Sequence, residues 1–489
     1  MTLRELAGSL DGAIATALPD VPVTGLALDS RRVKPGDVFF AMRGTQAEGA
    51  TFASDAVAAG ACAVVGPRGL RTKGAAAIEV DDPRLALAQA SCAFHGNPSR
   101  AMKLVAVTGT NGKTTTAWLL ESIFRAAGWR PGLLGTTGVR IGGALRPSTF
   151  TTPEAPELQA VLAEMLAAGV EAVAMEASSH ALAQRRTWGL ACRVAIFTNL
   201  TQDHLDYHGT MAAYFDAKLM LFDGRNGPRT RESTAVVCAD DAAAASVSAA
   251  ARLGGLRVVR YGEAATAEVR VASAVPAGDG VAVSLAHDGV ETRFTLPMFG
   301  RFNAQNAAGA FAAARALGVT PEAAVRGFAA FAGVPGRLER VPVARPFTVV
   351  VDYAHTPDAL ERALAACREH ATARVLCVFG CGGDRDRGKR PRMGALAAKG
   401  ADRAWVTNDN PRSEDPAAIA AEIVAGAPGA GLEVVLDRRE AIAAAIRDAG
   451  AGDVVLVAGK GHETTQTIGA QVLPFDDREV AREALEALA

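Results

Sequence analysis

Short apolar runs alternate with segments of helical period along most of the chain, a pattern typical of strands and helices in alternation. The clearest case lies between residues 103 and 127. There the apolar run 104–107 precedes a turn with Gly109 and Gly112, and apolar residues then recur at helical spacing from Trp118 to Ala127. Because alternating strands and helices form parallel sheets, the pattern predicts an α/β protein.

The pattern divides the chain into three predicted domains, residues 1–98, 99–336 and 337–489. In the first domain, strands are expected at 23–28, 37–41 and 61–65, a helix at 52–59 and a linker, GNPS, at 96–99. The second domain contains a glycine-rich, hairpin-like stretch at 138–150 and a helix at 154–168. The third begins after the turn PGRLER.

The string KLVAVTGTNGKTTT at 103–116 has the layout of a phosphate cradle, with a strand, a glycine turn, a lysine, hydroxyl residues and a helix. Backbone N–H groups at a helix start face an anion, Lys113 supplies a cation, and a threonine hydroxyl can ligate Mg²⁺. Two residues separate Gly109 from Gly112, whereas four separate the glycines of the usual P-loop. The alternative is an ordinary strand–turn–helix corner, but the whole string favours a nucleotide triphosphate.

Polar residues follow the next two predicted strands of the second domain. Glu176 ends an apolar run, where a Mg²⁺ or water ligand belongs beside a phosphate loop, and a surface glutamate in a turn is the alternative. After the strand 194–198, His204 is a candidate metal ligand or phosphate contact, with Asp206 and His208 to orient neighbours. Zinc would need further ligands, so Mg²⁺ beside a triphosphate is the simpler hypothesis.

Two later features have both a structural and a functional interpretation. Lys218, on a predicted helix at 211–222, is by itself a solvated helix lysine. The amides of Asn303, Gln305 and Asn306 open an alanine-rich helix, where they suit a purine edge or helix capping equally.

Four apolar runs of the third domain each end in a polar or glycine-rich loop. The runs and their loops are 347–351 with DYAHTPDAL, 374–379 with GCGGDRDRGKRPRMG, 403–406 with TNDNPRSEDP, and 454–457 with AGKGHETTQ. Loops at the same ends of a parallel sheet form the crevice in which open α/β sheets bind ligands. Their mixture of acids, amides and cations favours a zwitterionic or carboxylate-bearing ligand over a solvated basic loop.

Composition excludes several classes of function. Lys and Arg number 51 against 52 Asp and Glu, and aromatics make up 5%, which argues against nucleic acids and acidic membranes as partners. No run approaches a membrane span, and MTLRELAGSLDG lacks a signal-peptide core, so a cytoplasmic location is expected. The seven cysteines (62, 92, 192, 238, 367, 377 and 381) are expected to be reduced core residues, and a metal site at Cys377 and Cys381 is disfavoured.

Seven motifs resemble, in order, those of the ATP-dependent Mur ligases of bacterial peptidoglycan synthesis, most closely the members that add the third residue of the stem peptide. They are TGTNGKTTT, EASSHAL, TNLTQDHLDYHGT with Lys218 downstream, DYAHTPDAL, GCGGDRDRGKRP, DNPR and GKGHE. The resemblance covers essentially the whole length. It implies a small N-terminal α/β domain that holds a uridine nucleotide, a central P-loop-type ATPase domain with a parallel sheet, and a C-terminal Rossmann-like domain that receives an amino acid.

The resemblance also implies cofactors and site residues, position by position. ATP would contact Gly109, Thr110, Asn111, Gly112, Lys113, Thr114, Thr115, Thr116, Asn303, Asn306, Arg337 and Asp352. Mg²⁺ would be held by Thr114, Glu176, His204 and Lys218, the last as an anionic carbamate, and Lys113, Lys218 and His204 would be catalytic. UDP-MurNAc-L-Ala-D-Glu would contact Leu28, Ser30, Thr45, Gln46, Ala47, Thr151, Thr152, Ser178, Gln184 and Arg186.

The choice of amino acid is expected to rest on the third domain. DNPR at 409–412 resembles the form found in ligases that use meso-2,6-diaminopimelate, whereas lysine-adding relatives lack its arginine. Diaminopimelate has a second carboxylate that lysine lacks, and Arg412 can pair with it bidentately. The implied contacts are Arg385, Asp409, Asn410, Pro411, Arg412, Gly459 and Glu463, with Glu463 suited to the distal ammonium group.

The implied chemistry is amide bond formation through an acyl phosphate. The terminal carboxylate of the UDP-dipeptide attacks the γ-phosphate of ATP, and the amine of diaminopimelate then displaces phosphate. Closure of the domains would join the ATP and amino-acid sites. Folylpolyglutamate synthase, which shares the phosphate-loop pattern, and a nucleotide-operated switch without catalysis are the alternatives. We expect small-molecule partners only, and a monomer.

Overall fold

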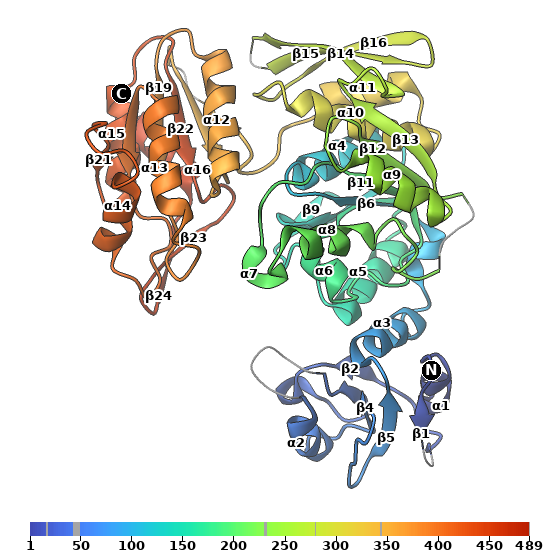
Figure 1. The fold of residues 1–489 in the computed structure, drawn as a ribbon. Helices are drawn as coiled ribbons and strands as arrows, with labels where there is room; N and C mark the ends of the chain where they lie inside the picture. Colours follow the sequence, from blue (N-terminus) through green and yellow to red (C-terminus); the bar gives the residue numbers. More distant parts are fainter. Residues whose placement is uncertain (16–17, 43–48, 229–231, 279, 343–344, 489) are drawn as a thin grey trace. The chain divides into compact units, whose positions relative to one another are not determined.

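The computed structural model describes residues 1–15, 18–42, 49–228, 232–278, 280–342 and 345–488 (Figure 1). Thr45, Gln46 and Ala47, three of the predicted nucleotide contacts, lie outside these residues. The described chain forms two compact units. One comprises residues 1–113, 124–260 and 311–320, and the other comprises 114–123, 261–310 and 321–489.

The N-terminal part of the first unit is a five-stranded sheet in the order β1-β5-β4-β3-β2. Its elements are α1 (Leu3–Gly8), β1 (Ile14–Ala15), β2 (Gly25–Ala27), η1 (Ser30–Arg32), β3 (Asp37–Phe40), η2 (Gly49–Phe52), α2 (Ala53–Ala58), β4 (Ala63–Pro67), β5 (Ala76–Val80) and α3 (Pro83–Phe94). Strands β2 to β5 are parallel, and apolar side chains pack on both faces of the sheet. The three predicted strands are confirmed, whereas the predicted helix at 52–59 is split between η2 and α2.

The predicted linker at 96–99 is exposed at Gly96 but packed at its last two residues. Pro98 and Ser99, in the short helix η3 (Pro98–Ala101), are buried. The Ser99 hydroxyl accepts a hydrogen bond of 3.1 Å from the Ala191 amide. Buried contacts therefore tie this segment to the rest of the first unit.

The largest sheet in the described chain has the strand order β16-β15-β14-β13-β12-β11-β6-β10-β7-β8-β9. Its strands are β6 (Lys103–Thr108), β7 (Pro131–Gly135), β8 (Gly138–Ile141), β9 (Ala144–Arg146), β10 (Ala172–Glu176), β11 (Cys192–Phe197), β12 (Thr234–Cys238), β13 (Arg257–Gly262), β14 (Val269–Ala277), β15 (Gly280–His287) and β16 (Val290–Leu296). The associated helices are α4 (Lys113–Ala126), α5 (Ala155–Ala167), α6 (Ser179–Ala183), α7 (Leu205–His208), α8 (Met211–Leu219), α9 (Ala244–Leu253), α10 (Asn303–Ala316) and α11 (Pro321–Ala329).

The middle of this sheet sets up the phosphate loop. Strand β6 lies between β10 and β11, and all three are parallel. Their carboxyl ends therefore bring Thr108, Glu176 and Phe197 to one edge, with Glu176 level with Val107. The predicted hairpin at 138–150 is confirmed, because β8 pairs antiparallel with both β7 and β9.

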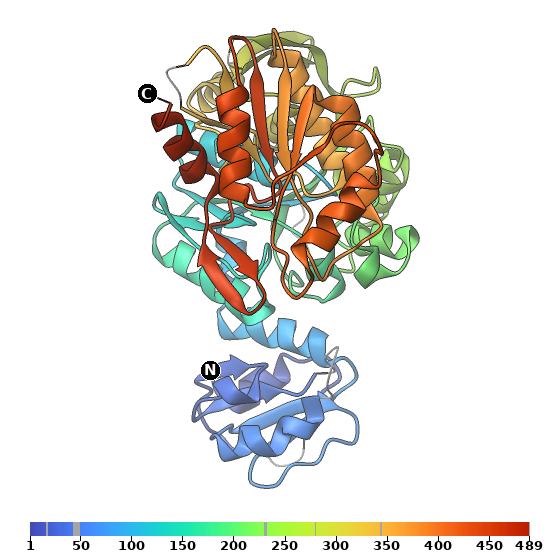
Figure 2. The same ribbon diagram turned by 90° about the vertical axis from the view of Figure 1, so that its left-hand side faces the viewer.

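The C-terminal part of the second unit has a sheet in the order β17-β18-β22-β19-β20-β21, parallel except for β17 (Figure 2). Its elements are β17 (Glu339–Val341), β18 (Thr348–Asp352), α12 (Pro357–His370), β19 (Val375–Phe379), α13 (Lys389–Gly400), β20 (Arg403–Val406), α14 (Pro416–Val424), β21 (Glu433–Val434), α15 (Arg438–Asp448), β22 (Val454–Ala458), the hairpin β23 (Thr465–Ile468) and β24 (Gln471–Pro474), and α16 (Asp477–Glu486). The four predicted strands are confirmed, and their loops lie at the same end of the sheet.

Alternating residues of these strands build two cores. Helices α12, α13 and α14 pack on one face, and α15 and α16 pack on the other. Helices on both faces of a mostly parallel sheet make a doubly wound arrangement, in agreement with the predicted Rossmann-like domain.

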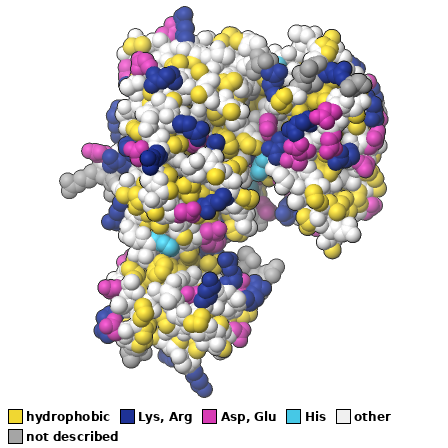
Figure 3. All heavy atoms as spheres, turned by 180° about the vertical axis from the view of Figure 1, so that it is seen from behind, with side chains coloured by type: hydrophobic (Ala, Val, Ile, Leu, Met, Phe, Trp, Pro, Cys, Tyr) yellow, Lys and Arg dark blue, Asp and Glu magenta, His cyan; other side chains and the backbone are white. Residues whose placement is uncertain are grey.

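The surface carries charges of both signs. On the face drawn in Figure 3, Lys and Arg are interspersed with Asp and Glu, as the near-zero net charge leads one to expect. Among the residues that the structure describes, no helix is both long enough and apolar enough to span a membrane. All seven cysteines are free thiols, and five of them are buried as expected for core residues, whereas Cys62 and Cys192 are only partly buried.

Candidate active site

The phosphate loop is a turn that only glycine can form at its first position. Gly109 has φ +146°, and a Cβ atom there would lie 1.9 Å from the Thr198 hydroxyl oxygen. Helix α4 then begins at Lys113. Backbone therefore approaches closely where the sequence predicts the phosphates, and α4 begins at the same place, so the positive end of its dipole faces the predicted anion site.

Residues just after β11 hold the loop in shape. The amides of Thr110 and Asn111 donate to the carbonyl and side-chain oxygens of Asn199, at 2.8 and 2.9 Å. The Thr198 hydroxyl donates to the Asn111 carbonyl at 2.6 Å. The motif TNLTQDHLDYHGT predicted chemistry only for its later residues. Because Thr198 and Asn199 directly follow a strand that neighbours β6, their position was the signal for this supporting role.

Two lysines converge on one main-chain carbonyl of this loop. Lys113 Nζ donates to the carbonyls of Gly109 and Thr110 at 2.9 and 2.7 Å, and Lys218 Nζ donates to that of Gly109 at 2.8 Å. Lys218 is only 2% exposed, and its ammonium group lies 4.3 Å from the ring centre of Tyr214. Burial, and to a lesser extent the charge of Lys113, lowers the pKa of Lys218 well below its usual value. The alternative of a solvated helix lysine is therefore wrong.

Glu176 is also buried, at 1% exposure, so the alternative of a surface glutamate is wrong as well. Its carboxylate accepts hydrogen bonds from the Thr136 amide at 2.8 Å and the Thr136 hydroxyl at 3.1 Å. Neutral donors thus fix the orientation of this carboxylate. Sequence reasoning did not find Thr136, which follows β7 at the same edge of the sheet.

His204 stands in a left-handed backbone conformation, φ +54°, at the start of α7. Its Nε2 atom lies 3.5 Å from Asp203, and its ring packs against His180 with 4.8 Å between ring centres. Burial lowers the pKa of His204 and lowers that of His180 to about 4. Both imidazoles are therefore neutral near pH 7, the form that ligates metals. His208, predicted to orient neighbours, lies 3.0 Å from the Ser179 hydroxyl.

The residues predicted to hold the muramoyl-dipeptide form one hydrogen-bonded group. The Thr152 hydroxyl donates to the Glu176 carbonyl and accepts from the Ser178 amide, at 2.8 and 3.2 Å. Arg186, 9% exposed, donates to the Thr152 carbonyl at 3.0 Å and to the Gln184 side chain at 2.6 and 3.0 Å. Thr151 joins through its hydroxyl, 3.1 Å from that of Thr136. The structure thus places this set beside Glu176.

The other predicted nucleotide contacts are less tightly assembled. Leu28 is exposed, and Ser30 begins η1, whose first turn is capped by the Asp29 carboxylate. The Asn306 amide donates to the Asn303 side-chain oxygen at 2.8 Å, and the Asn303 amide donates to the Phe299 carbonyl at 2.7 Å. In both bonds a side-chain NH₂ group is the donor, whereas a helix cap is a side-chain oxygen that accepts from a backbone N–H, so these bonds do not decide between the cap and the purine contact.

Arg337 and Asp352 lie together at the carboxyl end of β18, in the C-terminal sheet. The Asp352 carboxylate accepts from the Leu338 amide at 2.7 Å, and the Arg337 guanidinium lies 4.8 Å from the ring centre of Tyr353. Burial raises the pKa of Asp352 to about 6, although the positive charge of Arg337 opposes the shift. Arg337 also reaches to 3.5 Å from the Thr114 hydroxyl.

The loop after β20 and the loop after β22 meet in a buried polar triangle. The Asn410 amide donates to Glu463 Oε2 at 2.9 Å, and Lys460 Nζ lies 3.1 Å from both Glu463 Oε2 and Asn410 Oδ1. Lys460 is completely buried. Gly459, with φ +120°, leaves no room for a side chain beside Asp409, because a Cβ atom would lie 2.6 Å from Asp409 Oδ2. Sequence reasoning predicted no role for Lys460, which lies in the loop AGKGHETTQ.

Arg412 lies between the loop that follows β19 and the hairpin β23–β24. It has φ +51°, its amide donates to the Thr467 carbonyl at 3.1 Å, and its carbonyl accepts from the Gly469 amide at 2.7 Å. Its guanidinium donates to the Gly383 carbonyl at 2.7 Å. Arg385 is exposed on the same loop as Gly383. The structure therefore brings together Asp409, Asn410, Arg412, Gly459 and Glu463, beside a hairpin whose role the sequence did not predict, whereas within the described chain Arg385 bonds only to the neighbouring Asp384 carbonyl.

The chemistry of the predicted ligands shows whether they suit Mg²⁺. Among the described residues, no three His, Cys, Asp or Glu side chains come together as a metal site. The predicted set has one carboxylate, Glu176, one neutral imidazole, His204, and the Thr114 hydroxyl. Oxygen atoms from bound phosphates and from a carbamate on Lys218 would complete a set that suits Mg²⁺.

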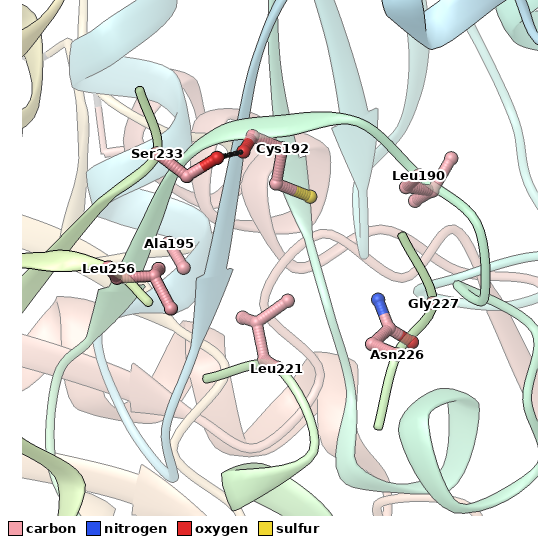
Figure 4. A pocket seen from close by; sticks show the side chains of 8 residues that line it. All are labelled: Leu190, Cys192, Ala195, Leu221, Asn226, Gly227, Ser233 and Leu256. Atoms are coloured by element: carbon pink, nitrogen blue, oxygen red, sulfur yellow. Dashed lines mark hydrogen bonds between the residues drawn. The ribbon is translucent and has the colours of Figure 1, made fainter. Parts of the chain in front are cut away.

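A small pocket elsewhere in the first unit contains none of the predicted contacts (Figure 4). Its wall is mostly apolar and is formed by Leu190, Cys192, Ala195, Leu221, Asn226, Gly227, Ser233 and Leu256. The Ser233 hydroxyl is already bonded to the Cys192 carbonyl at 2.8 Å.

Three family models match the chain in consecutive segments. They are the Mur ligase family catalytic domain at residues 22–95, the Mur ligase middle domain at 107–314, and the Mur ligase glutamate ligase domain at 336–461. Together they match most of the chain.

Relatives and solved structures agree with these models. UDP-N-acetylmuramoyl-L-alanyl-D-glutamate–2,6-diaminopimelate ligases from Solibacter usitatus and Synechococcus elongatus are 44% and 45% identical, over 99% of this chain and 98% and 99% of their own. A solved structure of a ligase of that name is 35% identical, with TM-score 0.72, and covers 100% of this chain and 99% of its own. Folylpolyglutamate synthase from Mycobacterium tuberculosis, at 21% identity and TM-score 0.63, covers 76% of this chain and 91% of its own, and shares the fold.

Proposed function

The chain belongs to the Mur ligase family, and from this premise we propose that it adds meso-2,6-diaminopimelate to UDP-MurNAc-L-Ala-D-Glu at the expense of ATP. The observation that carries the choice of amino acid is the group formed by Asn410, Arg412 and Glu463, in which the Asn410 side chain donates to Glu463 and the Asn410 carbonyl accepts from Arg412 at 3.4 Å. Asn410 thus links a guanidinium and a carboxylate, which match the carboxylate and ammonium of the distal end of diaminopimelate.

The phosphate loop is proposed to bind ATP. The Gly109 turn and the start of α4 present backbone N–H groups to the phosphates, and Lys113 supplies positive charge. Lys113 now donates to two loop carbonyls, so its ammonium group is already positioned before an anion arrives. Charge developing on the transferred phosphoryl group is then stabilised without large reorganisation.

Mg²⁺ is proposed to be held by Glu176, His204, the Thr114 hydroxyl and Lys218 as its carbamate. When bound, it offsets negative charge on the phosphates. A carbamate forms when a neutral amine attacks carbon dioxide and loses a proton. The buried Lys218 amine, whose pKa is lowered, supplies the neutral form, and the product removes the repulsion between Lys218 and Lys113.

The reaction follows from these placements. The terminal carboxylate of the UDP-dipeptide, near Thr152 and Arg186, attacks the γ-phosphorus, and ADP leaves. The neutral amine of diaminopimelate attacks the acyl carbon, the bond to phosphate breaks, and an amide forms. Because each substrate is small and soluble, a cytoplasmic monomer agrees with this proposal. A switch without catalysis would not need the amino-acid group around Arg412.

An assay with ATP, the UDP-dipeptide and either radiolabelled diaminopimelate or radiolabelled lysine tests the proposal. We expect a labelled UDP-tripeptide and ADP with diaminopimelate, and little product with lysine. Absence of product with both amino acids would contradict the ligase function. Product with lysine alone would contradict the role of Arg412 while leaving the ligase function intact.

A further inference from the structure

Arg438 and Asp477 form a completely buried ion pair beneath the amino-acid loops. Both side chains have 0% exposure. The guanidinium donates two hydrogen bonds to the carboxylate, Nε to Oδ1 at 2.8 Å and Nη2 to Oδ2 at 2.7 Å. Arg438 is the first residue of α15, and Asp477 is the first residue of α16. Burying two charges carries a desolvation cost that apolar side chains would avoid, so stability alone is a weak reason for the pair.

The remaining donors of Arg438 reach two main-chain carbonyls, one at the end of β22 and one just after β20. Nη2 donates to the Ala458 carbonyl at 3.0 Å, and Nη1 donates to the Asn408 carbonyl at 3.3 Å. These residues directly precede Gly459 and Asp409, both predicted contacts of the amino acid. One side chain therefore sets the distance between the two loops at the point where each leaves its strand.

The fit between those loops has little tolerance. A Cβ atom on Gly459 would lie 2.6 Å from Asp409 Oδ2 and 3.8 Å from Arg438 Nη2, so Gly459, Asp409 and Arg438 occupy adjoining positions. The next residues along the two loops, Asn410 and Lys460, belong to the polar triangle with Glu463. A shift at Asn408 or Ala458 would therefore move the groups that are proposed to hold the distal end of the ligand.

We propose that Arg438 and Asp477 are positioning residues of the amino-acid site, which fix the DNPR loop against the Gly459 turn so that diaminopimelate is bound and preferred over lysine. The proposal rests on the proposed function of this site. Neither residue is placed in contact with the ligand. Their effect acts through the carbonyls of Asn408 and Ala458, and Asp477 acts by orienting the Arg438 fork.

The same sheet offers a matched control at its opposite end. Arg374 and Asp453, directly before β19 and β22, also form an ion pair, in which Nη2 and Nε both donate to Oδ2, at 2.8 Å and 3.2 Å. Asp453 is 2% exposed. This pair ties strand starts together, whereas the Arg438 pair ties strand ends, where the predicted ligand contacts lie.

Steady-state kinetics of R438K, which keeps the charge but loses the fork, and of the apolar double variant R438M/D477L test the proposal. We expect the KM for diaminopimelate to rise about tenfold, the preference over lysine to fall, and the KM values for ATP and the UDP-dipeptide to stay within about twofold. The control R374M/D453L is expected to lower the melting temperature without changing any KM. An unchanged KM for diaminopimelate in a folded R438K or R438M/D477L would overturn the proposal.

Hydrogen exchange gives a readout that does not depend on turnover. In R438K, the amides of Asp409, Asn410 and Arg412 and of residues 459–461 should exchange faster than in wild type, while those at 374–376 should be unaffected. Unchanged exchange at 409–412 and 459–461 would also overturn the proposal. Wild-type turnover with diaminopimelate tests the proposed function separately, so an inactive wild type with faster exchange in R438K would contradict the function and not the positioning role.

Discussion

The phosphate loop and the amino-acid loops hold their cations in opposite ways. Lys113 and Lys218 converge on the neutral carbonyl of Gly109, where burial and the positive charge of Lys113 lower the pKa of Lys218. Lys460 and Arg438 instead meet the carboxylates of Glu463 and Asp477. The first arrangement attracts an anion whose charge it can neutralise, such as phosphate or carbamate. The second is already balanced, so it selects a ligand by the geometry of its charged groups.

The largest expected effect concerns Lys218, beside the phosphate loop. K218M should lower kcat about 100-fold or more, because it removes the group that becomes an anionic metal ligand. The exposed lysine variant K73M should keep wild-type activity. ¹³C-labelled bicarbonate should give a carbamate signal in wild type that is absent in K218M. Full activity in K218M would show that the buried lysine has only a packing role.

Removing the second-carboxylate contact should have the next largest effect. R412M should raise the KM for diaminopimelate about 10- to 100-fold, the loss expected for a charge-assisted hydrogen bond, and leave the KM for ATP unchanged. R387M, on the neighbouring loop, is the control, because Arg387 is exposed and pairs with Glu422. Equal rises in the KM for diaminopimelate and the KM for ATP would indicate a general disruption of the fold instead.

The buried ammonium of the polar triangle is expected to matter less. K460M leaves Asn410 Oδ1 and Glu463 Oε2 without one shared donor, so the KM for diaminopimelate should rise about tenfold, together with a lower melting temperature. The exposed helix variant K399M is the control. If K460M were as stable and as active as wild type, the balanced-charge description of this site would be wrong.

The smallest effect concerns the pH dependence of stability. The folded pKa of Asp352 is raised by burial to about 6, above its usual value of 3.8. The native state therefore binds more protons than the unfolded state between these values. The stability that this group contributes is complete below about pH 4 and is lost as pH rises through 6, on the order of 1 kcal/mol at this half-buried position. Denaturant midpoints of D352N should lack this decline, and parallel profiles for D352N and wild type would contradict the shift.

Sequence patterns predicted the strands and the motif positions well because each signal is local. The run before Glu176 and the four C-terminal strands end within a residue or two of their predicted limits. What the sequence could not supply is the partner of each polar group. Nothing local shows that Asn199 braces Thr110, that Lys218 is buried, or that Arg438 joins two loops, because these contacts connect residues separated by 20 to 109 positions.

The same limit explains the weaker predictions. The two asparagines at the start of α10 could serve a purine or a cap, and their bonds to each other and to Phe299 do not decide between these roles. The segment 96–99 was predicted as a linker from its composition, which gives no sign that Ser99 is buried and bonded to Ala191.

A reaction through an acyl phosphate moves one oxygen atom of the UDP-dipeptide carboxylate into inorganic phosphate, and isotope transfer tests this step most directly. With ¹⁸O in the terminal carboxylate of the UDP-dipeptide, attack on the γ-phosphate followed by attack of the amine should move one ¹⁸O atom into inorganic phosphate. We predict labelled phosphate in an amount equal to the UDP-tripeptide formed, with diaminopimelate as the second substrate. Unlabelled phosphate, or label in AMP, would contradict an acyl phosphate made at the phosphate loop.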